Sequence, residues 1–120
     1  FLKAVREKYP NIIIMADCAT LEEGVAAHAA GADLVGTTMN GYTPQTAGET
    51  GEPNFALVAR LVKTLPCPVI AEGRIHTPEQ ARKMLEIGAW AVVVGGAITR
   101  PLEIASRFMA AVRDLPGGMV

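Results

Sequence analysis

The chain has 120 residues, enough for one domain with its own core. Half of the residues are hydrophobic, few are aromatic, and the net charge is −1 with acidic and basic residues mixed. The absence of a basic cluster argues against binding to nucleic acid or to an anionic membrane, and no apolar run reaches the roughly 18 residues of a membrane span.

The chain begins with a charged amphipathic stretch rather than with a secretory signal. We therefore expect a cytoplasmic protein, and, since there is no initiating Met, a segment of a longer one. Cys18 and Cys67 predict no disulfide, because one follows an expected strand and the other precedes one, at opposite ends of a parallel sheet. Packed thiols of this kind are typical of a reducing compartment.

Apolar strands and capped helices alternate along the whole chain, with breaks at glycine and proline. A long loop rich in Gly, Thr and Pro covers 39–53. In chain order the pattern predicts a helix tail at 1–9, strand 11–16, helix 20–30, strand 33–38, helix 54–65, strand 69–71, helix 77–87, strand 89–94, helix 101–114 and a tail at 115–120.

Two β-α-β modules of the same design are repeated within this order. Capping boxes begin the helices at Thr20 and Thr77, and the same number of residues later Gly31 and Gly88 end them. Four strands alternating with helices predict parallel pairing with right-handed crossovers.

Two architectures use such units, the open doubly wound sheet and the closed (β/α)₈ barrel. The dinucleotide fingerprint G-x-G-x-x-G is absent, which argues against the first. Polar or small residues follow every strand, which favours the barrel, because barrels place their sites at the carboxyl ends of the strands. A complete barrel needs roughly 200 residues. We therefore expect residues 1–120 to form one α/β half-barrel, (β/α)₄, with four parallel strands in 11–114.

Two carboxylates are candidates for chemistry at that end of the sheet. Glu72 ends an apolar strand and would face the barrel mouth, where it suits acid–base catalysis; the alternative is a structural brace with Arg74. Asp17 has the equivalent place on the first strand. It could accept hydrogen bonds from sugar hydroxyls, or share the cap of the following helix with Thr20.

The loop after the last strand is a candidate phosphate site. Gly95 and Gly96 lie between a strand and a helix, where small residues allow backbone amides to approach an anion. Gly73 would join them from the neighbouring loop, and Arg74 or Arg100 could add a charge-assisted contact.

The segment 36–43 (Gly-Thr-Thr-Met-Asn-Gly-Tyr-Thr) supplies hydroxyls, an amide and an aromatic ring, the materials of a sugar site. The alternative is plain turn chemistry, since Asn-Gly is a turn dipeptide. We expect His28 and Trp90 to serve packing, and His76 has a weaker claim to the site. No metal-binding cluster is visible.

Four segments together resemble the N-acetylmannosamine-6-phosphate 2-epimerase family, in the same order and from about Ile12 to Phe108. They are 16–20 (Ala-Asp-Cys-Ala-Thr), 36–43, 70–74 (Ile-Ala-Glu-Gly-Arg) and 94–100 (Val-Gly-Gly-Ala-Ile-Thr-Arg). The resemblance implies the C-terminal half of a TIM barrel. It also implies interconversion of N-acetylmannosamine-6-phosphate and N-acetylglucosamine-6-phosphate in sialic-acid catabolism, with no metal or organic cofactor.

The reaction inverts C2 by removing its proton and returning one on the other face. By the resemblance, Glu72 is one of the two groups that move this proton. The other is a lysine that the family carries on an earlier strand, and Lys3, Lys8, Lys63 and Lys83 all fall on expected helices here. We therefore expect the first four strands to be missing and the chain alone to be inactive. The resemblance assigns the sugar to Asp17, Thr38, Gly41 and Tyr42, and the phosphate to Gly73, Arg74, Gly95, Gly96 and Arg100.

Alternatives remain open at this point. Flavin-dependent barrel oxidoreductases, thiazole synthases and other phosphate-binding barrels also place Gly-Gly after late strands. A third possibility is a non-catalytic phosphate-binding or assembly module. Because a half-barrel has unpaired edge strands and an exposed apolar face, we expect a homodimer or association with the missing N-terminal half.

Overall fold

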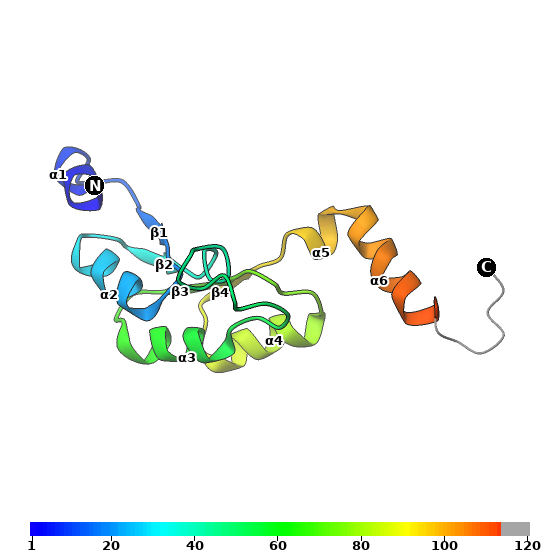
Figure 1. The fold of residues 1–120 in the computed structure, drawn as a ribbon. Coiled ribbons are helices and arrows are strands. Elements are labelled where there is room, and N and C mark those ends of the chain that lie inside the picture. The colour runs from blue at the N-terminus through cyan, green and yellow to red at the C-terminus, as the bar shows by residue number, and fades with distance from the viewer. Residues whose placement is uncertain (114–120) are drawn as a thin grey trace.

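The computed structural model describes residues 1–113; the expected tail at 115–120, and the end of the last helix at Asp114, lie outside them. Strands and helices alternate as the sequence predicts (Figure 1). The elements are α1 (Leu2–Lys8), β1 (Met15–Asp17), α2 (Leu21–Ala29), β2 (Leu34–Gly36), α3 (Phe55–Thr64), β3 (Val69–Glu72), α4 (Pro78–Ile87), β4 (Ala91–Val93), α5 (Gly96–Thr99) and α6 (Pro101–Arg113).

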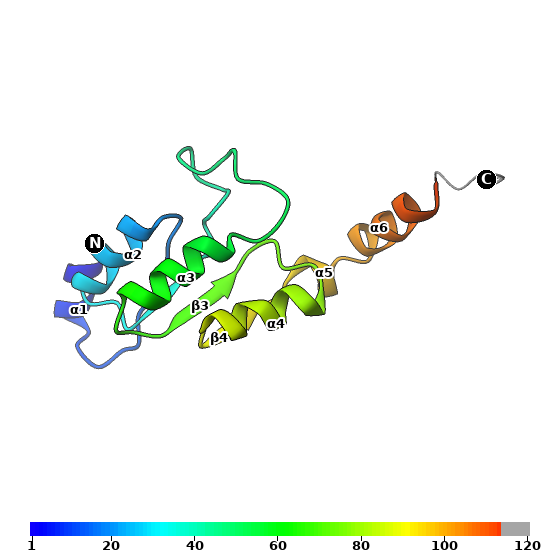
Figure 2. The same ribbon diagram turned by 90° about the horizontal axis from the view of Figure 1, so that it is seen from below.

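The strands form one parallel sheet in the order β1-β2-β3-β4. Helices α2, α3 and α4 pack side by side along one face of this sheet (Figures 1 and 2). On the strands, Met15 and Val93 are exposed, which marks the uncovered side. The chain is therefore half of a TIM barrel, with its helical layer present and its inner face open.

The core lies between the sheet and α3. Leu57 and Leu61 of α3 and Leu65 directly after it are all buried, as their spacing predicts, and Val35 of β2 is buried with them. Helix α2 comes close at Gly24, where an added Cβ would lie 2.6 Å from Cδ2 of Leu61. The small residue at this position therefore sets the separation of the two helices.

Both helix caps form, although with different partners. Thr77 accepts from the Gln80 amide while the Gln80 side chain accepts from the Thr77 amide, which completes the capping box. Thr20 likewise accepts from the Glu23 amide, but Glu23 reaches back one residue further, to the amide of Ala19 at 2.6 Å.

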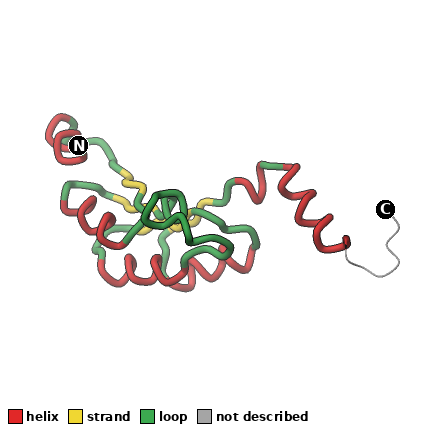
Figure 3. The backbone as a smooth tube through the Cα atoms, viewed as in Figure 1, coloured by secondary structure: helices red, strands yellow, loops and turns green. Residues whose placement is uncertain are grey.

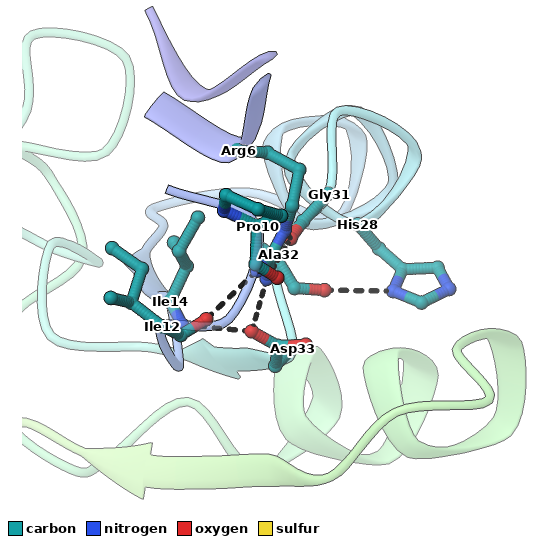
Figure 4. A network of polar contacts seen from close by, with 8 residues as sticks. All are labelled: Arg6, Pro10, Ile12, Ile14, His28, Gly31, Ala32 and Asp33. Carbon is teal, nitrogen blue, oxygen red and sulfur yellow. Dashed lines mark hydrogen bonds and ion pairs between the residues drawn. The ribbon is translucent and has the colours of Figure 1, made fainter. Parts of the chain in front are cut away.

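The first strand is shorter than predicted, and side chains contact part of the backbone of 10–14 (Figure 4). Arg6 donates to the carbonyls of Pro10 and Ile12 at 3.0 and 2.8 Å. Asp33 accepts from the Ile14 amide at 2.8 Å and pairs with Arg6. Side chains therefore satisfy the Ile12 carbonyl and the Ile14 amide, whereas the Ile14 carbonyl accepts from the backbone amides of Asp33 and Leu34. Regular strand pairing begins only at Met15.

This cluster predicts a dependence of stability on pH. The hydrogen bond from the Ile14 amide, and then that from Arg6, lower the pKa of Asp33 below its ordinary value of 3.8. A lowered pKa means that the ionised carboxylate favours the folded state, so its contribution is present above about pH 4 and is lost as the pH falls through the folded pKa. In thermal unfolding between pH 7 and 2.5, we expect Asp33→Asn to melt below the wild type at neutral pH and this difference to shrink below pH 4. Glu7→Gln, on exposed α1, is the control; a gap independent of pH would contradict the prediction.

The last strand also differs from the prediction. β4 covers Ala91–Val93 rather than 89–94, and the loop that follows contains the short helix α5. Trp90, expected to pack between the layers, is instead 71% exposed, because it precedes the shortened strand at the edge of the sheet.

Helix α6 extends away from the sheet (Figures 1 and 3). None of its residues is buried, and Leu102 and Phe108 are 80% and 74% exposed. The radius of gyration is 17.4 Å, against about 14 Å for a compact chain of this length. The helix therefore presents an apolar side that this chain does not cover.

Candidate active site

The carboxyl ends of the four strands meet at one edge of the sheet. Asp17 is the last residue of β1 and is level with Gly36 of β2, while Glu72 ends β3 level with Val93 of β4. The residues singled out in the sequence therefore come from adjacent strand ends or the loops that follow them, as the site of a barrel does.

Thr38 connects the two carboxylates. Its hydroxyl lies 2.6 Å from Oε2 of Glu72 and 3.1 Å from Oδ1 of Asp17. One hydroxyl has one proton, so it donates to one carboxylate at a time. Glu72 contacts Thr38 and not Arg74, so the brace considered in the sequence does not form. Asp17 takes no part in the cap that Thr20 provides, and the catalytic and sugar-binding roles of these two carboxylates stay predictions.

The Thr37 side chain forms two hydrogen bonds with the backbone of Glu72. Its hydroxyl donates to the Glu72 carbonyl at 2.9 Å and accepts from the Glu72 amide at 3.0 Å. Only 3% of Thr37 is exposed, so water does not compete for these bonds. The sequence placed Thr37 at a strand end but did not predict this pairing. The Thr37 side chain continues the hydrogen bonding between β2 and β3 beyond the last residue of β2.

An open cavity of about 390 Å³ lies beside Glu72, within the usual size range of small-ligand sites. Of the predicted site residues, those that line it are Thr38, Tyr42, Glu72, Gly73, Arg74, Gly95, Gly96 and Arg100. Asp17 and Gly41 lie outside the lining; Asp17 reaches the cavity only through Thr38. The other lining residues were not predicted as site residues, although His76 had a weaker claim; they are Met39, Ile75, His76, Val93, Ala97 and Glu103.

The glycine loop that follows β4 and Arg100 also line the cavity. No atom lies within 4 Å of the position that a Cβ of Gly95 would take, so its backbone is open to a ligand. Arg100 pairs with Glu103 at 2.8 Å, and this hydrogen bond lowers the pKa of Glu103. Because both side chains are exposed, such a pair contributes little to stability, and an anion could replace Glu103 as the partner of Arg100.

Arg74 lines the cavity but directs its guanidinium into the preceding loop. It donates to Oδ1 of Asn40 at 2.6 Å and to the carbonyl of Glu49. In this structure the guanidinium therefore contacts the loop 39–53, which carries Tyr42, rather than the glycine loop.

Cys18 follows Asp17 but is a packed thiol. Only 3% of it is exposed, and burial, followed by the charges of Glu23 and Asp17, raises its pKa to about 11. A nucleophilic cysteine works as the thiolate, so this thiol is unsuited to catalysis. Cys67 is also a free thiol, which confirms that the two do not form a disulfide.

The described part of the chain brings neither a lysine to the cavity nor a metal-binding cluster together. Lys3 and Lys8 lie on α1, Lys63 on α3 and Lys83 on α4, and none lines the cavity. Among residues 1–113 no group of three or more His, Cys, Asp or Glu is placed to hold a metal ion. Within the same range, no helix is both long and apolar enough to cross a membrane.

A family described as "Putative N-acetylmannosamine-6-phosphate epimerase" matches residues 1–114. The chain belongs to this epimerase family. The match covers every strand and all the residues of the cavity. It favours the epimerase interpretation over the flavin-dependent and thiazole-synthase alternatives.

Individual relatives agree with the epimerase family. The protein named "Putative N-acetylmannosamine-6-phosphate 2-epimerase" in Caldanaerobacter subterraneus subsp. tengcongensis is 52% identical over 114 residues, which is 95% of this chain and 48% of the relative. The solved structure of the N-acetylmannosamine-6-phosphate 2-epimerase from Clostridium perfringens superposes with a TM-score of 0.86 at 45% identity, over 92% of this chain and 49% of that one. The thiamine phosphate pyrophosphorylase of Pyrococcus furiosus, at 24% identity and a TM-score of 0.67, shares the fold.

The chain spans about half the length of the epimerase relatives that it matches. The half-barrel predicted from the sequence is thereby confirmed, both by the four-stranded parallel sheet and by the extent of these matches.

Proposed function

We propose that a complete barrel containing this chain is an N-acetylmannosamine-6-phosphate 2-epimerase, and that this chain supplies one of its two proton-transfer groups and its phosphate site. The observation that carries the proposal is the cavity that Glu72 lines together with Gly95, Gly96 and Arg100. A carboxylate and an anion-binding loop in one cavity suit a phosphorylated sugar. The relatives bear the name of the same activity.

The chemistry proposed for Glu72 follows from its place. In the ring-opened sugar, C2 is adjacent to the aldehyde, so breaking the C2–H bond sends its electron pair to the carbonyl oxygen and gives an enolate. A carboxylate can take that proton or return one, and inversion needs a second group on the other face of C2. This chain places no lysine in the cavity, so the second group comes from the other half of the barrel, and we expect the chain alone to be inactive.

We assign the substrate's remaining contacts to the residues around Glu72. The Thr38 hydroxyl and the Tyr42 ring line the cavity between Glu72 and the loop 39–53, in reach of a sugar. The amides at Gly73, Gly95 and Gly96 and the guanidinium of Arg100 take the phosphate. Asp17 contributes by sharing the Thr38 hydroxyl.

Glu103 provides a test of the phosphate assignment. Its carboxylate lines the cavity and holds Arg100, so a bound phosphate has to displace it. Glu103→Gln removes a like charge from the site, and we expect inorganic phosphate to inhibit the complete enzyme about threefold to tenfold more strongly. Glu79→Gln, in the first turn of α4, is the control. An unchanged inhibition constant for Glu103→Gln would argue against a phosphate at Arg100.

The partner that we propose is a second half-barrel that completes the sheet. Strands β1 and β4 are both edges, the inner face is uncovered, and α6 extends with an apolar side exposed. The relatives are about twice as long as this chain. The first half of such an epimerase would supply strands that pair with the edges β1 and β4 and side chains that cover the inner face.

Native mass spectrometry tests the partner. We expect the 120-residue chain, mixed at micromolar concentration with the N-terminal half of the Clostridium perfringens enzyme, to form a 1:1 complex. A homodimer of the chain alone that excludes this half would assign the surface to a second copy. A mixture of monomers would overturn the proposal.

The broader setting follows from the same proposal. An epimerase of this kind serves sialic-acid catabolism, and the two free thiols fit a reducing compartment such as the cytoplasm.

The proposal is tested by deuterium incorporation at C2 of N-acetylmannosamine-6-phosphate, followed by NMR in D₂O. The proteins are the 120-residue chain and a complete barrel in which the N-terminal half of the Clostridium perfringens enzyme precedes it. We expect C2 exchange and the second epimer with the complete barrel, and neither with the chain alone. A folded complete barrel without exchange would contradict the proposal, and a yellow protein would point to flavin chemistry.

A further inference from the structure

Arg74 has an unusual backbone conformation for a residue with a side chain. Its φ is 58°, and among residues 1–113 it is the one residue other than glycine with a positive φ. Left-handed backbone is unfavourable for such residues and persists where surrounding contacts impose it, often at functional sites. The contacts of the guanidinium show what imposes it here.

The guanidinium connects the loops that follow three different strands. Arg74, after β3, donates to Oδ1 of Asn40, after β2, and Asn40 in turn donates to the carbonyl of Ala19, after β1, at 2.9 Å. Asn40 and Ala19 are 4% and 1% exposed. Nη1 and Nη2 of Arg74 both have acceptors, while its Nε has none among the described residues. A buried chain of hydrogen bonds holds its members closely, so we expect the position of Arg74 to determine how these loops lie.

The same guanidinium closes the loop 39–53 on itself. It donates to the carbonyl of Glu49, and both of these groups pack on Gly41, where an added Cβ would lie 2.8 Å from that carbonyl and 3.4 Å from Nη1 of Arg74. The Gly41 amide also donates to Oγ1 of Thr46, which is buried. Tyr42 follows directly on this anchored turn and lines the cavity.

We propose that Arg74 is a positioning residue for the sugar end of the site, and not a phosphate ligand. Its guanidinium holds the loop 39–53 so that Met39 and Tyr42 form one wall of the cavity beside Glu72. The assignment of this wall to a sugar rests on the function proposed above, whereas the attachment of the loop does not. Lysine cannot replace Arg74, because one ammonium cannot reach both acceptors with the geometry of a guanidinium.

Limited proteolysis of the 120-residue chain tests the attachment without any assay of activity. The peptide bond after Glu49 includes the carbonyl that Arg74 holds, so glutamyl endopeptidase reports opening of this loop. We expect Arg74→Met and Arg74→Lys to speed cleavage after Glu49 about tenfold, at unchanged far-UV circular dichroism. Arg82→Met removes only an exposed pair with Glu86 and is the matched control. Cleavage at the wild-type rate in both Arg74 variants would overturn the proposal, whatever the complete enzyme does.

Kinetics of the complete barrel then separate positioning from phosphate binding. For Arg74→Met we expect KM for the sugar phosphate to rise about tenfold, since an unanchored wall has to be ordered on binding, while the inhibition constant of inorganic phosphate changes by less than about twofold. Arg100→Met, as the comparison, should weaken inhibition by phosphate at least about tenfold. Equal weakening by both variants would make Arg74 a phosphate ligand and overturn the proposal. If the complete barrel is inactive, the proposed function fails while the proteolysis result still stands.

Discussion

Replacing Glu72 with Gln in the complete barrel is expected to reduce deuterium exchange at C2 by about two to four orders of magnitude, the range typical of a general acid or base. Gln keeps the length of the side chain and still accepts from the Thr38 hydroxyl that lies 2.6 Å from Oε2 of Glu72. The hydrogen bonds between the Thr37 hydroxyl and the Glu72 backbone do not involve the substituted side chain. The variant should therefore lose proton transfer while the site keeps its shape.

The measurement is the initial rate of C2 exchange by NMR, with inhibition by inorganic phosphate as a check that the site is intact. Glu86→Gln is the matched control, since Glu86 lies on the exposed side of α4 and pairs only with Arg82. A Glu72→Gln enzyme that exchanges within about threefold of the wild type would remove Glu72 from the proton path.

The second large effect is expected in the core. Leu61 is fully buried between α2, α3 and the sheet, and Leu61→Ala should lower the free energy of unfolding by about 2–5 kcal/mol. Gly24→Ala should cost about 1–3 kcal/mol by overpacking, because its Cβ would lie 2.6 Å from Cδ2 of Leu61 and 3.4 Å from Cγ1 of Val35.

The double variant tests whether positions 24 and 61 are in direct contact or destabilise the protein independently. The new methyl at position 24 enters the space that Leu61 vacates, so the double variant should be more stable than the sum of the single effects predicts, by at least about 0.5 kcal/mol. Urea denaturation, followed by circular dichroism, measures the free energy of unfolding of both single variants and of the double variant. Leu102→Ala, at an 80% exposed position on α6, is the control. Strict additivity would mean that α2 and α3 do not meet at Gly24 and Leu61.

The helical layer could be predicted from sequence because its signals are local. Caps at Thr20 and Thr77, the glycine at 88 and the leucine spacing of α3 act within one or two turns, and the structure has the helices where these signals place them. The strands were harder to delimit. The run 11–14 reads like a strand, but Arg6 holds the Ile12 carbonyl and Asp33 holds the Ile14 amide, and these contacts join residues far apart in the sequence.

In the candidate site, too, the local features could be predicted from the sequence and the long-range contacts could not. A carboxylate at the end of a buried strand and glycines after another are visible in the sequence, and the parallel sheet brings Glu72, Gly95 and Gly96 to one cavity. The partners of these groups could not be predicted. Whether Arg74 meets Glu72, a phosphate or the loop 39–53 depends on its left-handed backbone. The pairing of Arg100 with Glu103 likewise depends on how α6 follows α5.

The two open edges of the sheet have a geometric consequence for assembly. Because all four strands point the same way, β1 and β4 are not equivalent edges, and continuing the sheet as a (β/α)₈ barrel requires further strands of the same direction. A neighbour that pairs with β4 but fails to curve back to β1 would leave a new edge of the same kind, so that copies could add without limit. A neighbour with four more strands and matching curvature returns to β1 and ends the growth, since eight strands close the ring. The curvature of the sheet therefore decides between a finite particle and a filament.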